Sequence, residues 1–417
     1  MNRIWQRYFN DLPSEVAVVT TVAFCVALGF GIVAPVVPLF AQSFGVSAFA
    51  ASAVISLFAL MRFISASPAG WLVNHFGERW VLRTGLSIVA ISSALAGCAQ
   101  TYPQLIILRG LGGAGSAMFT VSAMSLLLRT VNQEQRGRAT SLYQSGFLFG
   151  GLAGPAVGGL VVGFSIRAPF FVYAATLTLA VIATVVGLPK GLGHPEHDQE
   201  PSHIDNEAPM LLSVALKMRN YWTALSVNLT TGLTTFGLRS SIIPIFVIEV
   251  LHRDARTASV GFLISSLAQA LLLLPAGRMT DSRDRKLPLI LGTSLLSLAL
   301  LALIFDQSFF VFAISMVLMG VSSAFLGAAP TAVVGDIVGA RRGGQVVGVY
   351  QMTSDLGIVI GPLIAGYLKD STGGFTWPFI VAFAISVVTL ILTTTLDESK
   401  RNKQAENLHH NNSSTVS

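Results

Sequence analysis

Long apolar stretches, separated by short polar segments, dominate the sequence. Twelve stretches approach or exceed the roughly 20 residues that a helix needs to cross about 30 Å of hydrocarbon. Polar and apolar positions do not alternate within them, so they predict helices rather than the strands of a closed barrel. The predicted spans are residues 16–42, 47–73, 81–99, 103–128, 139–164, 168–188, 221–250, 257–276, 287–305, 308–334, 346–368 and 377–396.

Four short sequence matches recur at a single offset of 207 positions, which indicates duplication of a six-helix unit. The matches are Pro68-Ala69-Gly70 with Pro275-Ala276-Gly277, Gly113 with Gly320, Tyr143-Gln144 with Tyr350-Gln351, and Gly154-Pro155 with Gly361-Pro362. Because six is an even number, both copies have the same membrane orientation, and a substrate then binds between them near the membrane midplane.

We therefore predict an all-α polytopic membrane protein with twelve transmembrane helices in two parallel six-helix pseudo-repeats. The predicted parts are an N-terminal bundle at 1–188, a cytoplasmic linker at 189–218, a C-terminal bundle at 219–396 and a disordered cytoplasmic tail at 397–417. The linker is polar and rich in proline, which favours a flexible tether over a metal site at its three histidines.

Composition excludes several other classes of protein. The 417 residues are 53% hydrophobic and only 11% charged, whereas a soluble domain carries about 25% charged residues. The net charge of +6 comes from short basic clusters in loops rather than from a stripe that would bind nucleic acid. Cys25 and Cys98 lie in apolar stretches and are interpreted as inert. No catalytic triad, nucleotide motif or metal cluster is evident, so we expect no enzyme and no cofactor.

The distribution of basic residues predicts the orientation in the membrane. Of the 26 Lys and Arg residues, most share one side with the N-terminus, and only Arg167, Arg253, Arg256 and Lys369 fall in loops on the other side. The positive-inside rule then places both termini in the cytoplasm. We expect a multi-pass protein of the cell membrane, surrounded by lipid.

Charges inside apolar spans are candidates for function, because each costs about 2.5–3.5 kcal/mol on insertion scales. They are Arg62, Arg109, Arg239 and Asp355. Asp355 is the one acid placed well inside a span, and it is the candidate for proton coupling; the alternative is a static ion pair with an arginine. Residues that either line a cavity or hold helices together are Tyr143, Gln144, Asn228, Gln269, Tyr350 and Gln351.

Four segments resemble three signatures of the major facilitator superfamily. Residues 70–79 and 277–286 resemble its loop signature, with Asn74 in place of the usual acid that the second copy keeps as Asp281. The signature residues are Gly70, Asn74, Gly77, Arg79, Gly277, Asp281 and Arg285. Residues 108–115 resemble the arginine-bearing signature of span four. Residues 150–159 resemble the signature of drug:proton antiporters through Gly150, Gly154, Pro155, Gly158 and Gly159, and Gly361 and Pro362 repeat part of it.

The resemblance implies a monomeric secondary active transporter that exports a small, amphipathic solute or drug by alternating access, with the proton gradient as its energy source. It implies that Arg109 helps to govern proton exchange, and that the span-five glycines face the other half and seal against proton leak. It also implies a cytoplasmic latch that is charged at Asp281 and neutral at Asn74. The alternatives are a sugar or metabolite exporter or facilitator of this superfamily, and a membrane receptor that transports nothing.

Overall fold

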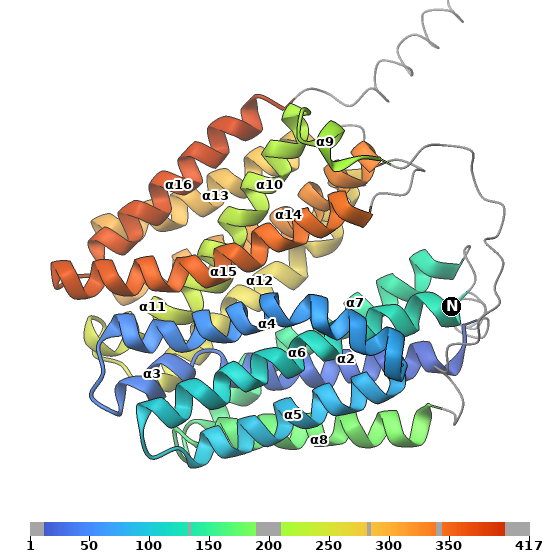
Figure 1. Cartoon of the computed structure of the whole chain (residues 1–417). Coiled ribbons are helices and arrows are strands. Elements are labelled where there is room, and N and C mark those ends of the chain that lie inside the picture. The colour runs from blue at the N-terminus through green and yellow to red at the C-terminus, as the bar shows by residue number, and fades with distance from the viewer. Residues whose placement is uncertain (1–11, 132–134, 189–209, 282–284, 339–343, 397–417) are drawn as a thin grey trace, which may run out of the picture. The chain divides into compact units, whose positions relative to one another are not determined.

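A computed structural model of the chain describes residues 12–131, 135–188, 210–281, 285–338 and 344–396 (Figure 1). Within these ranges the regular elements are helical and none is a strand, as predicted. They are α2 (Ser14–Val33), α3 (Val37–Gln42), α4 (Ala48–Phe76), α5 (Glu78–Cys98), α6 (Tyr102–Thr130), α7 (Arg136–Val161), α8 (Ala168–Gly187), α9 (Leu212–Ala215), α10 (Arg219–Thr231), the π-helix η2 (Gly232–Leu238), α11 (Arg239–Glu249), α12 (Ala255–Asp281), α13 (Lys286–Phe305), α14 (Phe309–Val338), α15 (Gly344–Thr372) and α16 (Thr376–Thr394). The predicted tail and most of the predicted linker lie outside the described residues.

The first predicted span, 16–42, is wrong as a single helix, because it divides into α2 and α3. Pro35 lies between these helices, and a proline in a helix interior removes a backbone hydrogen bond and clashes with the preceding turn. Pro38 stands in the first turn of α3, where the missing N–H group has no intrahelical partner to lose. The other predicted spans each correspond to a helix or, for 221–250, to the continuous rod of α10, η2 and α11.

The surface of the described helices suits lipid rather than water. Eleven of the helices or rods are long and apolar enough to cross a membrane; α7, whose sequence is rich in glycine, is the remaining predicted span. Large apolar side chains stand exposed on several of them, such as Val186 (81%), Leu271 (77%) and Leu160 (73%). Hydrocarbon solvates such side chains, whereas water would drive them together.

The helices form two compact units. Unit 1 contains Met1–Ser202, Arg239–Leu263 and Pro362–Ser371, and unit 2 contains His203–Leu238, Ile264–Gly361 and Thr372–Ser417. Unit 1 thus joins the first six predicted spans to α11, the start of α12 and the last part of α15. The predicted division into bundles at 1–188 and 219–396 stays a prediction.

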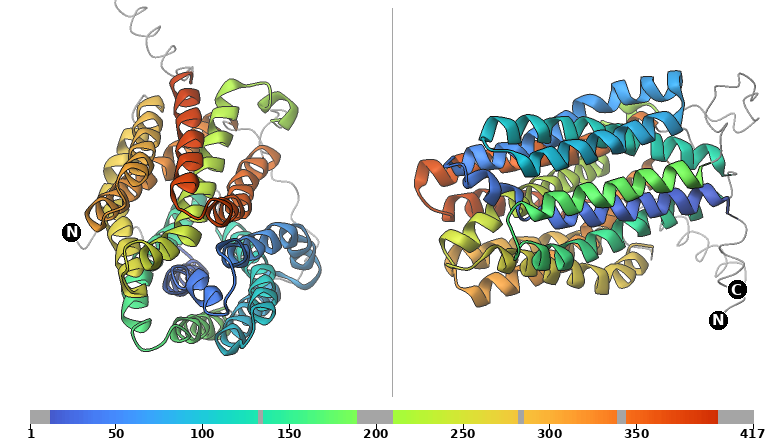
Figure 2. Two further views of the ribbon diagram at one scale, coloured as in Figure 1. Left: turned by 90° about the vertical axis from the view of Figure 1, so that its left-hand side faces the viewer. Right: turned by 90° about the horizontal axis from the view of Figure 1, so that it is seen from below.

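Each unit is built from helices that lie side by side. In unit 1, α2 contacts α7 and α8, while α6 contacts α4 and α5 (Figure 1). In unit 2, α13 contacts α14 and α16, and α10 contacts α14 and α16 (Figure 2). The largest fully buried side chains of unit 1 include Phe40, Phe119, Phe170 and Tyr173, so the apolar core follows these helix contacts.

The repeat of 207 positions recurs in helix contacts. A Cβ atom at Gly113 of α6 would collide with the carbonyl oxygen of Phe58 on α4, and one at Gly320 of α14 would collide with that of Ser265 on α12. The equivalent contacts of α5 and α13 are those of Gly85 with Met118 and Phe119, and of Gly292 with Phe325 and Leu326. Both members of each contact are displaced by the same 207 positions, so the two copies share one internal arrangement.

Candidate functional site

Arg109 lies in the first third of α6 and is only 3% exposed. Its guanidinium carbon is 4.5 Å from the centroid of the Phe58 ring on α4, a cation–π distance. Its Nε atom is buried and has no hydrogen-bond partner among the described residues. The structure therefore places a full positive charge within an apolar helix bundle, as the sequence predicts.

Glycines on α6 bring the neighbouring helices close to Arg109. A Cβ atom at Gly115 would lie 2.7 Å from the carbonyl oxygen of Gly85 on α5, and one at Gly112 would lie 3.0 Å from the hydroxyl of Ser92. Small residues at such positions allow the close helix contacts typical of membrane bundles. The glycine run beside Arg109 thus serves helix contact and fixes the surroundings of the charge.

Two further predicted residues lie near these helices in unit 1. Arg62 follows Phe58 by one turn of α4, so both side chains start from the same helix face. Tyr143 of α7 is 2% exposed, and its ring meets Phe147 edge-on at 5.2 Å. The Tyr143 hydroxyl is buried without a hydrogen-bond partner in the described part of the chain.

The antiporter signature on α7 lies against α2. A Cβ atom at Gly154 would lie 2.7 Å from both the Cα atom of Gly31 and the carbonyl oxygen of Leu28, and Gly150 and Gly158 meet α2 in the same way. The Pro155 ring also faces Gly31, while Gly151 has open surroundings and Gly159 faces Ser259 of α12. Three of the glycines thus contact a helix of their own predicted half. The seal against proton leak stays a prediction.

The second copy repeats this close contact in unit 2. Gly357 and Gly361 of α15 lie against the backbone of Leu229 and Leu233, at the junction of α10 and η2. Pro362, which follows Gly361, lies within α15. The sequence analysis did not identify Gly31 and Gly357, although each lies in the same glycine-rich pattern as its neighbours.

Asn228 and Tyr350 hold three helices of unit 2 together. The Asn228 amide on α10 donates to the Tyr350 carbonyl oxygen on α15 at 2.6 Å, and the Tyr350 hydroxyl lies 3.1 Å from the Thr331 hydroxyl on α14. Their polar groups form hydrogen bonds between helices. Of the two predicted roles, lining a cavity or holding helices together, these contacts favour the second. Gln351 on α15 and Gln144 on α7 are exposed, and Gln269 on α12 is half-buried.

Asp355 lies on α15 beside the π-helix η2. The residue before it, Ser354, presents its carbonyl oxygen to Gly232, where a Cβ atom would collide with it. π-Helical segments in longer helices are frequent at functional sites. Nothing in the sequence analysis predicted this segment, which leads directly into Arg239 at the start of α11.

The three arginines within the spans and Asp355 belong to different units. The Arg239 guanidinium carbon is 5.1 Å from the centroid of the Phe262 ring, and both residues lie in unit 1 with Arg62 and Arg109. Asp355 lies in unit 2 and is half-buried. An ion pair between Asp355 and one of these arginines stays a prediction.

The loop signature of the first copy forms a tight helix junction. α4 ends at Phe76 and α5 begins at Glu78. Gly77 lies between them, and its φ of 81° is a backbone conformation that favours glycine. The Glu78 carboxylate accepts hydrogen bonds from the Ser125 hydroxyl at 3.0 Å and from Arg129 at 2.7 Å. Gly70 has open surroundings, Arg79 is half-buried and Asn74 is exposed.

The second copy carries the same ion pair with its charges reversed. Arg285 and Asp336 are 3.1 Å apart, and each lies 207 positions after Glu78 and Arg129 respectively. Gly277 has open surroundings, and the side chain of Asp281 lies outside the described residues. The predicted latch between Asn74 and Asp281 thus stays a prediction. Adding 207 to the positions of Glu78 and Arg129 gives Arg285 and Asp336, so the sequence repeat alone could have revealed the second ion pair.

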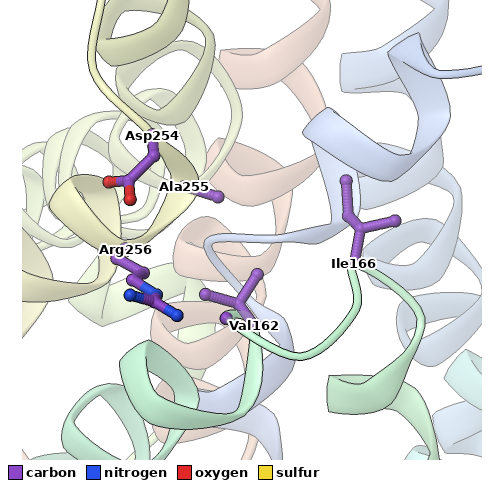
Figure 3. Close-up of a pocket in the computed structure, with 6 residues that line it drawn as sticks. Val162, Ile166, Asp254, Ala255 and Arg256 are labelled. Carbon is purple, nitrogen blue, oxygen red and sulfur yellow. The ribbon is translucent and has the colours of Figure 1, made fainter.

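A pocket of about 340 Å³ lies where α7 ends and α12 begins (Figure 3). Its lining residues are Val162, Gly163, Ile166, Asp254, Ala255 and Arg256. The Asp254 carboxylate accepts a hydrogen bond from the Thr257 N–H group at 3.1 Å and so caps α12. None of the predicted site residues lines this pocket, so it is not the predicted site.

The chain is similar to known transporters along nearly its whole length. It is 25% identical over 409 residues to Multidrug resistance protein 2 of Bacillus subtilis (strain 168), covering 96% of this chain and 100% of that protein. It is 27% identical over 383 residues to Multidrug resistance protein MdtG of Enterobacter lignolyticus (strain SCF1), covering 89% of each.

The fold also agrees with a solved transporter structure. A bacterial homologue of the human lysosomal transporter Spinster, solved in an inward-facing and unoccupied conformation, superposes with a TM-score of 0.76 at 15% identity, covering 91% of this chain and 96% of that one. A profile of the Major Facilitator Superfamily matches residues 19–255 and 229–416. The chain therefore belongs to the Major Facilitator Superfamily and is a multi-pass membrane transporter.

Proposed function

We propose that this transporter exports a small, amphipathic solute across the cell membrane in exchange for protons, by alternating access of the halves at 1–188 and 219–396. The burial of Arg109 carries the proposal. A guanidinium that is 3% exposed and faces an aromatic ring has given up nearly all its hydration. A charge within an apolar span costs about 2.5–3.5 kcal/mol on insertion scales, and we infer that it is retained because proton exchange requires it.

Asp355 is the group we propose to bind the transported proton. It is half-buried on an apolar span and adjoins a backbone contact between α15 and the π-helix. A carboxylate that accepts a proton loses its charge, and with it the cost of lying in a medium of low dielectric constant. Its protonation state can therefore follow the side of the membrane to which it is open.

An amphipathic solute is the class that the similarities favour. Two relatives carry the name multidrug resistance protein, and the chain covers nearly all of each. The first span carries no acid, unlike several drug antiporters, so the solute does not have to be a cation. A neutral amphipathic compound is therefore tested beside a lipophilic cation.

The test is transport in proteoliposomes with an imposed pH gradient. The probes are ethidium as a lipophilic cation, Nile red as a neutral amphipathic dye and a radiolabelled hexose. We expect the pH gradient to drive movement of at least one of the two dyes. A protonophore, which dissipates the gradient, should abolish this movement. Asp355→Asn should remove the dependence on the gradient, whereas Asp306→Asn, in the loop between α13 and α14, should not.

Other outcomes identify the alternatives. Movement of the hexose down its own gradient, with no effect of pH, would indicate a sugar or metabolite facilitator. Solutes that stabilise the protein against heat but never cross the membrane would indicate a receptor. Coupling that is unchanged in Asp355→Asn would remove this residue from the mechanism.

A further inference from the structure

The N-terminus of α4 is capped by a residue from the far end of the chain. The N–H group of Ala48 donates to one oxygen of the Asp370 carboxylate at 3.0 Å, and the N–H group of Phe49 donates to the other at 2.7 Å. Asp370 lies near the end of α15, in the same compact unit as α4. The first amides of a helix lack intrahelical partners and carry partial positive charge, so a carboxylate there is strongly held.

A second polar contact lies beside this cap. Lys369, the neighbour of Asp370 in the chain, pairs with Glu249 at 2.9 Å. The same Glu249 carboxylate accepts a hydrogen bond from the Gln42 amide at 3.1 Å. Glu249 is the last residue of α11 and Gln42 is the last residue of α3. The ends of α3, α11 and α15 are thus joined next to the start of α4.

The backbones of α4 and α15 touch directly behind the cap. A Cβ atom at Gly366 of α15 would lie 2.7 Å from the Cα atom of Phe49 and 2.9 Å from the Ser52 hydroxyl. Ser52 is fully buried. No side chain larger than hydrogen fits at position 366 while α15 lies on α4, so exposure of Ser52 reports that the helices have separated.

The equivalent contact in the other copy lacks the acid. The offset of 207 relates Ser52 to Ser259, Phe49 to Arg256, Gly366 to Gly159 and Asp370 to Gly163. Gly159 faces Ser259, as Gly366 faces Ser52, so the helix contact is retained. At the position of the cap, however, the Arg256 guanidinium lies against Gly163, on the side of Arg256 that faces the turn carrying Val162 (Figure 3). Glycine has no side-chain group that could accept a hydrogen bond from the first turn of α12.

We propose that Asp370, supported by the pair of Lys369 and Glu249, is a positioning residue that holds α15 on α4 and closes the predicted extracellular end of the transport pathway. The counterpart contact at Gly163 and Arg256 closes without such a hold. The inference rests on alternating access, which is part of the proposed function. In each cycle, opening toward the outside requires both hydrogen bonds to Asp370 to break.

The rate of alkylation at position 52 tests this proposal. Ser52→Cys is introduced into a background of Cys25→Ser and Cys98→Ser, and the protein in lipid nanodiscs is treated with N-ethylmaleimide. Asp370→Asn should raise the rate about tenfold, the factor expected when one charge-assisted hydrogen bond is lost. Glu249→Gln should raise it less. An unchanged rate in Asp370→Asn would overturn the proposal.

Matched variants separate loss of the Asp370 contact from general loosening of the protein. Asp306→Asn removes an acid that caps only its own loop, through Ser308, and should leave the rate at position 52 unchanged. Ser93→Cys, buried within α5, should stay unreactive in Asp370→Asn. Reaction at both buried positions would show general unfolding and would also overturn the proposal.

An acid can also be introduced at Gly163, the position equivalent to Asp370 in the other copy. Gly163→Asp places an acid beside Arg256 at the start of α12, and it should slow alkylation of Ser259→Cys several-fold; an unchanged rate would contradict the role assigned to an acid at this position. All these rates are measured without solute or gradient. Failure to export drugs would therefore contradict the proposed function but not the role of Asp370. An unchanged rate in Asp370→Asn would contradict the role of Asp370 even if the protein exports drugs.

Discussion

Removal of Arg129 is expected to destabilise the protein more than removal of Asp336, although these two residues occupy equivalent positions in the two copies. The difference lies in the partner that each leaves behind. The Glu78 side chain is 2% exposed and would keep the Ser125 hydroxyl as its donor, whereas the Arg285 side chain is 15% exposed and reaches water more readily. A buried charge without a counter-charge is far more costly than a partly solvated one.

The magnitudes follow from burial. Breaking a buried ion pair by removal of one partner costs about 3–5 kcal/mol, and the 56% exposure of the Arg129 side chain favours the lower end of that range. The partly exposed pair of Arg285 and Asp336 is worth about 1 kcal/mol. For a unit of this size, 1 kcal/mol shifts the Tm by about 2–4 °C. Arg129→Ala should therefore lower the apparent Tm by about 6–12 °C, and Asp336→Ala by about 2–4 °C.

The assay is the fraction of monodisperse protein left after heating in detergent, followed by size-exclusion chromatography with fluorescence detection. The double variant Glu78→Gln/Arg129→Ala should regain most of the lost stability, because a neutral amide can still accept the hydrogen bond from Ser125 without a buried charge. Equal losses in Arg129→Ala and Asp336→Ala would refute the reasoning. So would a double variant as unstable as Arg129→Ala alone.

Three further changes test other contacts. Gly154→Ala places a Cβ atom 2.7 Å from backbone atoms of α2 and should cost about 1–3 kcal/mol in the same heating assay, whereas Gly151→Ala, in open surroundings, should cost nothing measurable. Asn228→Ala removes the hydrogen bond from α10 to α15 and should lower the apparent Tm by a few degrees, corresponding to about 1 kcal/mol. In efflux assays, Asp281→Asn should reduce transport more than Asn74→Asp does, because only Asp281 brings charge to the predicted cytoplasmic latch; equal losses would contradict a lopsided latch.

The fold follows from the sequence because the membrane imposes simple rules. A span must be apolar and long enough, and its backbone must be satisfied internally, so run length alone predicts helices. The prediction failed where local backbone chemistry overrides apolarity. Pro35 separates α2 from α3 although the stretch is apolar throughout, and the π-helix η2 has no periodicity that distinguishes it from the α-helix around it. Hydropathy does not register either feature.

The candidate site is less accessible to such reasoning, because its contacts join positions far apart in the chain. Burial of Arg109 follows from its place in an apolar stretch, whereas its contact with Phe58 depends on the crossing of α4 and α6. Asn228 carried two equally plausible roles, and only the hydrogen bond to α15 favours helix contact. The cap by Asp370 requires the end of α15 to meet the start of α4, which no local pattern predicts.

The two copies agree where backbones meet and differ where charges meet, and the reason is physical. Gly113 and Gly320 are both glycine because any Cβ atom would collide with the backbone of the neighbouring helix. An ion pair requires only that its two charges be opposite, so the acid and the base can exchange positions. They do so here: Glu78 pairs with Arg129 in the first copy, and Arg285 pairs with Asp336 in the second. A helix cap in one copy does not require a cap in the other. The position of Asp370 can therefore be occupied by glycine, Gly163, in the other copy. Duplication thus supplies matching helix contacts in the two copies, while the charged contacts near the helix ends are free to differ. In the proposed alternating access the two ends open in turn, and unequal contacts at the ends would let each end respond to its own signal.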